Sequence, residues 1–274
     1  MIRRFIAFIF FFLLMTTIQA QQKINYGSNS GKYCTIRGVK IYYEEYGKGI
    51  PLILLHGGIQ SIHDFQEVIP SLSKKYRVIA FDRPCHGRSE HIDSLSYHIM
   101  AEFTSLFIDQ LRLDSTYLMG WSDGGNTGLL VAAMRPDKVK KIIICGADLN
   151  EGKEGSQAPG NLQMITPEFV ENNWKDWLRN YQHLSPQPYL WKAFIIKTVK
   201  MWLQIDYISK KEMQELHCKT LLILGDRDVV NPEAGIKMHR LIPGSQFCIL
   251  PNTTHFMFAE KPDILSRLAL DFLK

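Results

Sequence analysis

The chain has 274 residues, of which 46% are hydrophobic and 22% are charged, and both values are ordinary for a folded globular protein. A single α/β domain commonly reaches this length, so we expect one domain with an insertion rather than two domains. The formal net charge is +5 and no run of five or more like charges occurs, so no nucleic-acid partner is expected.

The first twenty residues have the three-part pattern of a secretory signal peptide. Arg3 and Arg4 precede an unbroken apolar run over residues 5–15, and polar residues then lead to Ala20. We expect cleavage after Ala20 and an exported protein, periplasmic or secreted. An uncleaved anchor is the alternative, but the apolar run is shorter than the about 20 residues that a bilayer span needs. No stable membrane span is therefore expected after cleavage.

The cysteines of the mature chain are odd in number and include no Cys-x-x-Cys pair. This arrangement supports neither a metal site nor a disulfide framework, and no cofactor is expected. An exported protein can still form one bridge, and the spacing does not identify it. The residues concerned are Cys34, Cys85, Cys145, Cys218 and Cys248.

Short apolar runs alternate with amphipathic segments, which predicts an α/β fold with a mostly parallel sheet and helices on both faces. The opening segments, residues 33–37 and 39–46, are predicted to form an antiparallel hairpin around Gly38. Further strands are predicted over residues 51–55, 76–81, 115–119, 141–145, 220–224 and 246–250. Helices are predicted over residues 96–111, 124–134 and 262–273, and another begins at Asn231-Pro232.

Residues 148–211 interrupt this alternation and are predicted to form a helical lid on a core of residues 21–147 and 212–274. The segment 151–160 is rich in Gly, Ser, Gln and Pro, which is typical of a loop. We expect most of the aromatic residues that follow to pack the lid onto the core, with one or two facing a substrate. These residues are Trp174, Trp177, Tyr181, Tyr189, Trp191 and Trp202.

Residues 120–124 match the Gly-x-Ser-x-Gly motif, with Ser122 at the centre, between a predicted strand and a predicted helix. So sharp a turn needs small flanking residues, and it lifts the serine hydroxyl out of the sheet. The helix N-terminus beneath favours developing negative charge. Ser122 is therefore the predicted nucleophile.

A serine nucleophile needs a base and an orienting acid, and the expected chain order is serine, acid, histidine. His255 follows one predicted strand, and Asp226 and Asp228 follow the strand before it. These positions lie at the carboxyl edge of the sheet, where ligands bind in open α/β folds. In an extended segment Asp226 and Asp228 point to the same side, so side-chain alternation leaves both open as the acid.

His56-Gly57-Gly58 follows the first central strand. Glycines there let the backbone bend so that an N–H group faces the nucleophile. The N–H groups of Gly58 and Asp123 are predicted to form an oxyanion hole. A plain turn is the alternative interpretation of the two glycines.

These motifs resemble those of the α/β-hydrolase superfamily, over nearly all of residues 33–274. In that family the Gly-x-x-Asp-x-x-x-Pro element carries the catalytic acid, which selects Asp228, and a helical lid follows the sixth core strand. Pro84-Cys85 departs from the pairs common in the loop before Gly87, and it leaves the triad intact. The matching residues are His56-Gly57-Gly58, Asp82 with Gly87-Arg88-Ser89, Gly120-Trp121-Ser122-Asp123-Gly124-Gly125, Gly225-x-x-Asp228-x-x-x-Pro232 and His255.

The Trp-Ser-Asp-Gly-Gly form of the serine motif is similar to the biphenyl hydrolase-like subgroup, which includes valacyclovir hydrolase and whose members cleave α-amino acid esters. The resemblance implies that Asp123, the residue after the serine, holds a substrate amino group. An acid that stabilises the first turn of its helix is the alternative for Asp123. The expected substrate-binding residues are Asp123, Trp121 and Ile59.

The sequence thus predicts a serine hydrolase that cleaves a small ester, thioester or amide through an acyl-serine intermediate. A lactonase, a carbon–carbon hydrolase or a cofactor-free haloperoxidase with the same triad are alternatives. A ligand-binding or sensor protein without turnover is the alternative from another class. The expected partner is a small acyl substrate, and the sequence indicates no oligomeric state.

Overall fold

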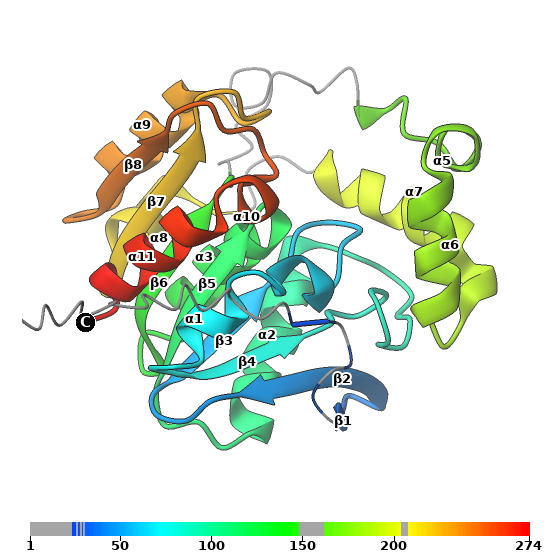
Figure 1. Ribbon diagram of the computed structural model, residues 1–274, viewed down its shortest axis with the longest axis horizontal. Coiled ribbons are helices and arrows are strands. Elements are labelled where there is room, and N and C mark those ends of the chain that lie inside the picture. Colours follow the sequence, from blue (N-terminus) through cyan, green and yellow to red (C-terminus); the bar gives the residue numbers. More distant parts are fainter. Residues whose placement is uncertain (1–23, 26, 28, 30, 148–161, 204–207) are drawn as a thin grey trace, which may run out of the picture.

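The structure is a computed structural model that describes residues 24–274 except 26, 28, 30, 148–161 and 204–207 (Figure 1). The predicted signal peptide, residues 1–20, and the predicted loop, residues 151–160, lie outside the described residues. No helix in the described part of the chain has both the length and the apolar character that a bilayer span requires.

Eight strands form one sheet in the order β1-β2-β4-β3-β5-β6-β7-β8. β2 pairs antiparallel with β1 and with β4, and the remaining pairs are parallel, which confirms the predicted fold class. The strands are β1 (Lys32–Ile36), β2 (Val39–Tyr46), β3 (Pro51–Leu55), β4 (Arg77–Phe81), β5 (Thr116–Trp121), β6 (Val139–Cys145), β7 (Lys219–Gly225) and β8 (Gln246–Leu250).

Helices cover both faces of this sheet (Figure 1). The short elements η1, α1 and α10 have four residues each and carry no periodic pattern from which they could be predicted. The core helices are η1 (Ile62–Phe65), α1 (Ile69–Leu72), α2 (Tyr97–Gln110), α3 (Asp123–Met134), α8 (Lys210–Gln214), α9 (Pro232–Leu241), α10 (Met257–Glu260) and α11 (Pro262–Phe272).

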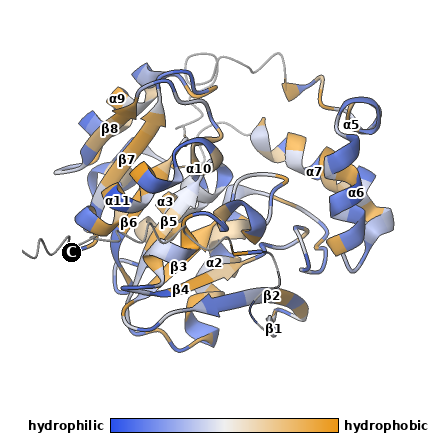
Figure 2. Ribbon diagram, viewed as in Figure 1, coloured by the Kyte–Doolittle hydropathy of each residue, from blue (hydrophilic) through white to orange (hydrophobic). Residues whose placement is uncertain are grey.

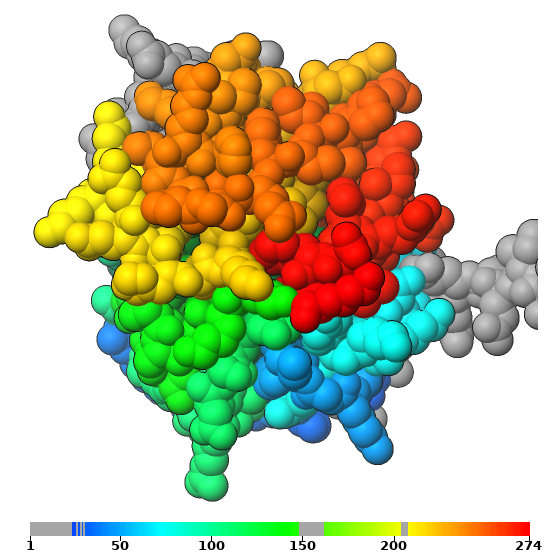
Figure 3. Space-filling view, turned by 90° about the vertical axis from the view of Figure 1, so that its left-hand side faces the viewer, coloured from blue at the N-terminus to red at the C-terminus, as the bar shows by residue number. Residues whose placement is uncertain are grey.

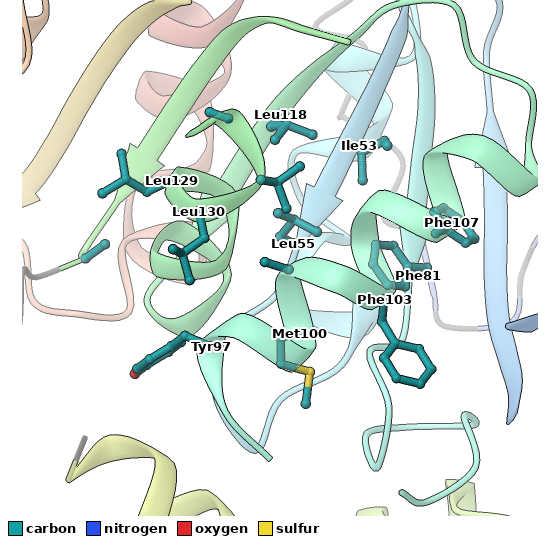
Figure 4. Packing of buried hydrophobic residues seen from close by; sticks show 14 of the residues in the cluster. Ile53, Leu55, Phe81, Tyr97, Met100, Phe103, Phe107, Leu118, Leu129 and Leu130 are labelled. Carbon is teal, nitrogen blue, oxygen red and sulfur yellow. The ribbon is translucent and has the colours of Figure 1, made fainter. Parts of the chain in front are cut away.

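Side chains of the central strands alternate between two apolar cores, one on each face of the sheet. Ile53 and Leu55 of β3 pack with α2 and α3, as Figure 4 shows, whereas Leu52 and Leu54 pack with α1 and α11. Figure 3 shows α11, in red, against the cyan segment that contains α1. Burial on both faces explains why these strands are continuous apolar runs, and Figure 2 shows the apolar colour concentrated in them.

Two parts of the predicted lid, residues 148–211, are described: residues 162–203, which are mainly helical and lie at one side of the molecule (Figure 1), and residues 208–211. The aromatic side chains of the lid pack on one another: the rings of Trp177, Tyr181 and Phe194 form a stack. α8 begins at the predicted lid boundary. The lid elements are α5 (Pro167–Asn173), α6 (Lys175–Leu184), η3 (Pro188–Leu190) and α7 (Trp191–Trp202).

Gly124 brings the first turn of α3 against the end of β3. A Cβ atom at this position would lie 1.9 Å from the Leu55 carbonyl oxygen and 2.6 Å from that of His56. Both neighbours are backbone atoms at the centre of the sheet, so neither can move aside at low cost. A Cβ atom at Gly128, one turn later in α3, would meet the flexible side-chain ends of Ile142, Leu55 and Leu118, at 3.1, 3.3 and 4.0 Å.

We therefore expect Gly124→Ala to lower the free energy of unfolding by about 3 kcal/mol, since it forces the helix away from the sheet. Gly128→Ala is the matched control, because its contacts can relax and alanine favours the helix by about 1 kcal/mol. Urea unfolding of both variants measures the difference. Equal free energies of unfolding for Gly124→Ala and Gly128→Ala would contradict the claim that α3 has no room for a side chain against β3.

Candidate active site

Ser122 occupies a strained turn between β5 and α3. Its φ of 53° and ψ of −121° lie outside the regions that non-glycine residues favour, at a cost of about 1–3 kcal/mol. Gly120 makes the turn possible, because a Cβ atom there would lie 2.2 Å from the Gly124 carbonyl oxygen. The predicted strand–turn–helix context of the serine is present.

His255 and Asp228 meet across the loops that follow β8 and β7. The distance between His255 Nδ1 and Asp228 Oδ1 is 2.6 Å, and the Asp228 side chain has no solvent exposure. Oδ1 also accepts the Val230 N–H at 3.0 Å, which fixes the carboxylate. Because a carboxylate accepts hydrogen bonds, Nδ1 of His255 carries the proton, and Nε2 is left free to accept one.

Asp226 lies away from His255 and makes different contacts from Asp228. It is exposed, and its Oδ1 accepts the Thr253 N–H at 3.0 Å, which ties the β7 loop to the loop that leads to His255. This backbone N–H holds the pKa of Asp226 below its usual value. The two carboxylates diverge because the chain turns after Gly225, with the Asp228 N–H donating to the Gly225 carbonyl. The expected same-side placement of Asp226 and Asp228 is therefore wrong.

The predicted oxyanion donors lie in the loop after β3 and at the start of α3. Gly58 and Ser122 line the same cavity, and Asp123 is the first residue of α3. Neither the Gly58 N–H nor the Asp123 N–H donates to another backbone group within the described residues, so both can serve an anion. A Cβ atom at Gly58 would lie 2.2 Å from Asp123 Oδ2 and 2.7 Å from the Trp202 ring, so a larger residue here would displace these two side chains.

The Asp123 carboxylate is 3% exposed and is bonded by two helices. Tyr97 in α2 donates its hydroxyl to Oδ1 at 2.8 Å, and Trp202 at the end of α7 donates its indole N–H to Oδ2 at 2.7 Å. Figure 4 shows Tyr97 at the start of α2, with its hydroxyl turned away from the labelled apolar side chains. Sequence reasoning missed both partners, because nothing in the motifs points to residues so distant in the chain.

The other two predicted substrate-binding residues border the cavity and also hold neighbouring backbone. Trp121 is nearly buried, and its indole N–H donates to the His255 carbonyl at 2.9 Å. Ile59 has a φ of 53°, and its carbonyl accepts the indole N–H of Trp177 in α6 at 2.6 Å. Trp121 therefore supports the histidine loop, and the lid supports the loop that contains Gly58.

A cavity of about 480 Å³ lies above these groups, a size typical of small-molecule sites. Of the lid aromatics, Trp174, Trp177 and Trp202 line it, whereas Tyr181 and Trp191 are buried in the lid packing. The number that face the cavity thus exceeds the one or two expected. Its other apolar lining residues are Ile59, Tyr97, Trp121, Leu162, Ile165, Val229, Val230 and Phe256.

The structure assigns no metal site or disulfide within the described residues. No group of three or more potential ligands is placed to hold a metal ion in that part of the chain. The five cysteines all lie in it, and all are free thiols.

Known proteins similar to this chain are hydrolases. A family described as "alpha/beta hydrolase fold" matches residues 50–189. The 2-hydroxy-6-oxo-6-phenylhexa-2,4-dienoate hydrolase of Burkholderia cepacia is 27% identical over 285 residues, covering 90% of this chain and 97% of that protein. Serine hydrolase BPHL of Homo sapiens is 24% identical over 272 residues, covering 87% and 84% respectively.

Among solved structures, the meta-cleavage product hydrolase of Pseudomonas fluorescens IP01 superposes with a TM-score of 0.74 at 21% identity. The match covers 89% of this chain and 97% of that one. These similarities confirm the predicted resemblance to biphenyl hydrolase-like proteins.

Proposed function

This chain belongs to the α/β-hydrolase fold family and is a hydrolase, and on that basis we propose that it cleaves a small ester through an acyl-serine intermediate. One observation carries the proposal: the strained Ser122 turn shares a cavity with His255, whose Nδ1 is held 2.6 Å from buried Asp228. Orientation of the base by a buried acid is what a serine nucleophile requires. No cofactor takes part in this chemistry.

In the first step, His255 Nε2 takes the proton from Ser122 Oγ while Oγ bonds to the ester carbonyl carbon. The electron pair of the carbonyl bond moves to its oxygen. The N–H groups of Gly58 and Asp123 then donate to this oxyanion. Within the described residues no hydrogen bond joins Ser122 Oγ to His255 Nε2, and such bonds often form only when substrate is bound.

In the second step the carbonyl bond re-forms and the bond to the leaving oxygen breaks. The proton on His255 passes to that oxygen, and an alcohol departs. Water then loses a proton to His255 and attacks the acyl carbon. Collapse of this second tetrahedral species releases the acid and returns the proton to Ser122 Oγ.

The charge of the cavity bears on the substrate class. Its described lining residues include the acid Asp123 and no lysine or arginine. The dienoate hydrolases among the relatives act, by their names, on carboxylates, and a lining acid opposes an anionic substrate. Apolar walls and a lining acid favour esters that are neutral or carry an amino group.

A fluorophosphonate probe should label Ser122, because phosphonylation uses the same nucleophile and base. Peptide mass mapping locates the label, and p-nitrophenyl acetate hydrolysis measures turnover. Ser122→Ala should lose the label and lower kcat by about 10⁶-fold. Turnover that persists in Ser122→Ala would falsify the proposed mechanism, and labelling without turnover would favour a binding protein.

Asp228→Asn should lower kcat by about 10⁴-fold, because the amide favours the wrong histidine tautomer. Asp226→Asn is the matched control, with the same chemical change two residues earlier. Its amide oxygen can still accept the Thr253 N–H, so kcat should change by less than about threefold. Steady-state kinetics with one ester compare the variants. Equal losses would contradict the assignment of Asp228 as the orienting acid.

The role of Asp123 can be tested with two substrates that differ only in an amino group, the benzyl esters of phenylalanine and 3-phenylpropanoic acid. If the carboxylate binds the ammonium, Asp123→Asn should lower kcat/KM for the amino ester about tenfold more than for the neutral ester. Equal losses would leave Asp123 with a structural role. Cleavage of a dienoate carboxylate faster than either ester would identify a carbon–carbon hydrolase instead.

A further inference from the structure

Arg83 follows β4 and is completely buried, although the proposed mechanism does not use it. It takes part in none of the ion pairs formed by the described residues. Its Nε atom also lacks a hydrogen-bond partner there. A buried charge without a paired carboxylate is costly, and an apolar side chain of similar size often packs more stably. Core packing therefore does not explain why an arginine occupies this buried position.

The guanidinium lies beneath the loop that contains Gly58. Nη2 of Arg83 donates to the His56 carbonyl at 2.7 Å and to the Gly57 carbonyl at 3.0 Å, and Nη1 donates to Thr127 Oγ1 at 3.2 Å. One side chain thus joins the loop after β3 to α3, the helix that begins after Ser122.

The Gly57 carbonyl receives a second strong donor. Arg83 gives its backbone N–H to His56 Nε2 at 3.1 Å, so the ring proton of the neutral imidazole is on Nδ1, which lies 2.8 Å from the Gly57 carbonyl oxygen. Burial keeps this imidazole neutral by lowering the pKa of His56 well below its usual value. The Gln60 backbone N–H also donates to this oxygen, at the longer distance of 3.4 Å. Three donors therefore converge on a single carbonyl, and of these only Arg83 is charged.

That carbonyl and the Gly58 N–H belong to the same peptide group. Hydrogen bonds to a peptide oxygen draw electron density toward it and make the N–H of that peptide a stronger donor. The N–H concerned is the one predicted to face the oxyanion. Only the Gly57–Gly58 peptide group separates the positive charge of Arg83 from the position where the proposed oxyanion forms.

Asp123 makes this positive charge necessary. Its carboxylate lies beside Gly58 and, taken alone, would oppose an oxyanion at the Gly58 N–H. Burial lowers the pKa of Arg83, and the negative charge of Asp123 acts in the opposite direction, so the two charges influence each other. Arg83 offsets Asp123 from the side of the loop that faces away from the cavity.

We propose that Arg83 is a positioning residue of the oxyanion hole, which holds the Gly57–Gly58 peptide in place and polarises its N–H toward the developing oxyanion. The inference rests on the proposed ester hydrolysis at Ser122. Arg83 acts through Gly58 and does not touch the substrate.

Kinetics separate this role from a purely structural one. Arg83→Gln keeps a side-chain N–H donor but removes the positive charge. Arg83→Lys keeps the positive charge but loses the planar guanidinium with its two separate donor nitrogens. Removing a whole oxyanion donor costs about 10²–10³-fold in kcat, so weakening one in Arg83→Gln should cost about 10–100-fold, with KM changed less than about threefold. Arg83→Lys should recover most of the lost kcat. A purely structural role predicts equal defects in the two variants, or a loss in KM alone, and either result would overturn the proposal.

A second readout observes the peptide itself. The chain contains two Gly-Gly pairs, Gly57-Gly58 and Gly124-Gly125. Glycine labelled with ¹³C at the carbonyl and with ¹⁵N therefore gives two signals in a carbonyl–amide correlation spectrum. Arg83→Gln should move the Gly57–Gly58 signal upfield in both the carbonyl carbon and the amide proton, and move the Gly124–Gly125 signal much less. An unmoved Gly57–Gly58 signal would refute polarisation.

Thr127→Val provides a milder variant if Arg83→Gln does not fold. It removes the acceptor of Nη1 and keeps the charge, so it should move the same signal in the same direction with a smaller fall in kcat. No movement and no fall in kcat would count against the proposal. If wild-type protein neither hydrolyses esters nor labels at Ser122, the proposed function fails, and the spectrum still decides whether Arg83 polarises the peptide.

Discussion

The turn at Ser122 determines where the other groups of the site can lie. A Cβ atom at Gly120 would meet the Gly124 carbonyl, and one at Gly124 would meet the Leu55 carbonyl, so the two glycines let α3 begin against the carbonyl end of β3. This approach brings the first N–H of α3 beside the loop that contains Gly58. The same backbone contact that strains Ser122 therefore also positions the two proposed oxyanion donors.

Two opposite charges are buried around that contact. Asp123 is held by donors from Tyr97 and Trp202, and Arg83 is held by the carbonyls of His56 and Gly57. In a low-dielectric site each charge acts over a longer range than in water, so their balance decides what the cavity accepts. Asp123 lines the cavity and Arg83 does not, an arrangement consistent with the proposed preference for neutral or amino-bearing substrates and with the proposed role of the Gly58 N–H.

The sequence was sufficient to predict the sheet and the strand ends at which Ser122, Asp228 and His255 lie, because strand ends and glycine motifs are local signals. It could not separate Asp226 from Asp228 by periodicity, since the turn after Gly225 breaks the extended geometry on which alternation depends. The partners of Asp123 and Arg83 could not be predicted either. Their hydrogen bonds join residues far apart in the chain, and such contacts leave no periodic or compositional trace.

The lid and the oxyanion hole are physically coupled. Trp177 of α6 donates to the carbonyl of Ile59, directly after Gly58, and Trp202 of α7 donates to the carboxylate of Asp123. α6 and α7 therefore each hold a residue that supplies, or adjoins, one of the proposed oxyanion donors. Movement of α6 or α7 away from the core would break one of these hydrogen bonds and remove a donor from its acceptor. The contacts that hold the lid over the cavity are therefore the same contacts that hold the loop and the carboxylate next to the two proposed oxyanion donors.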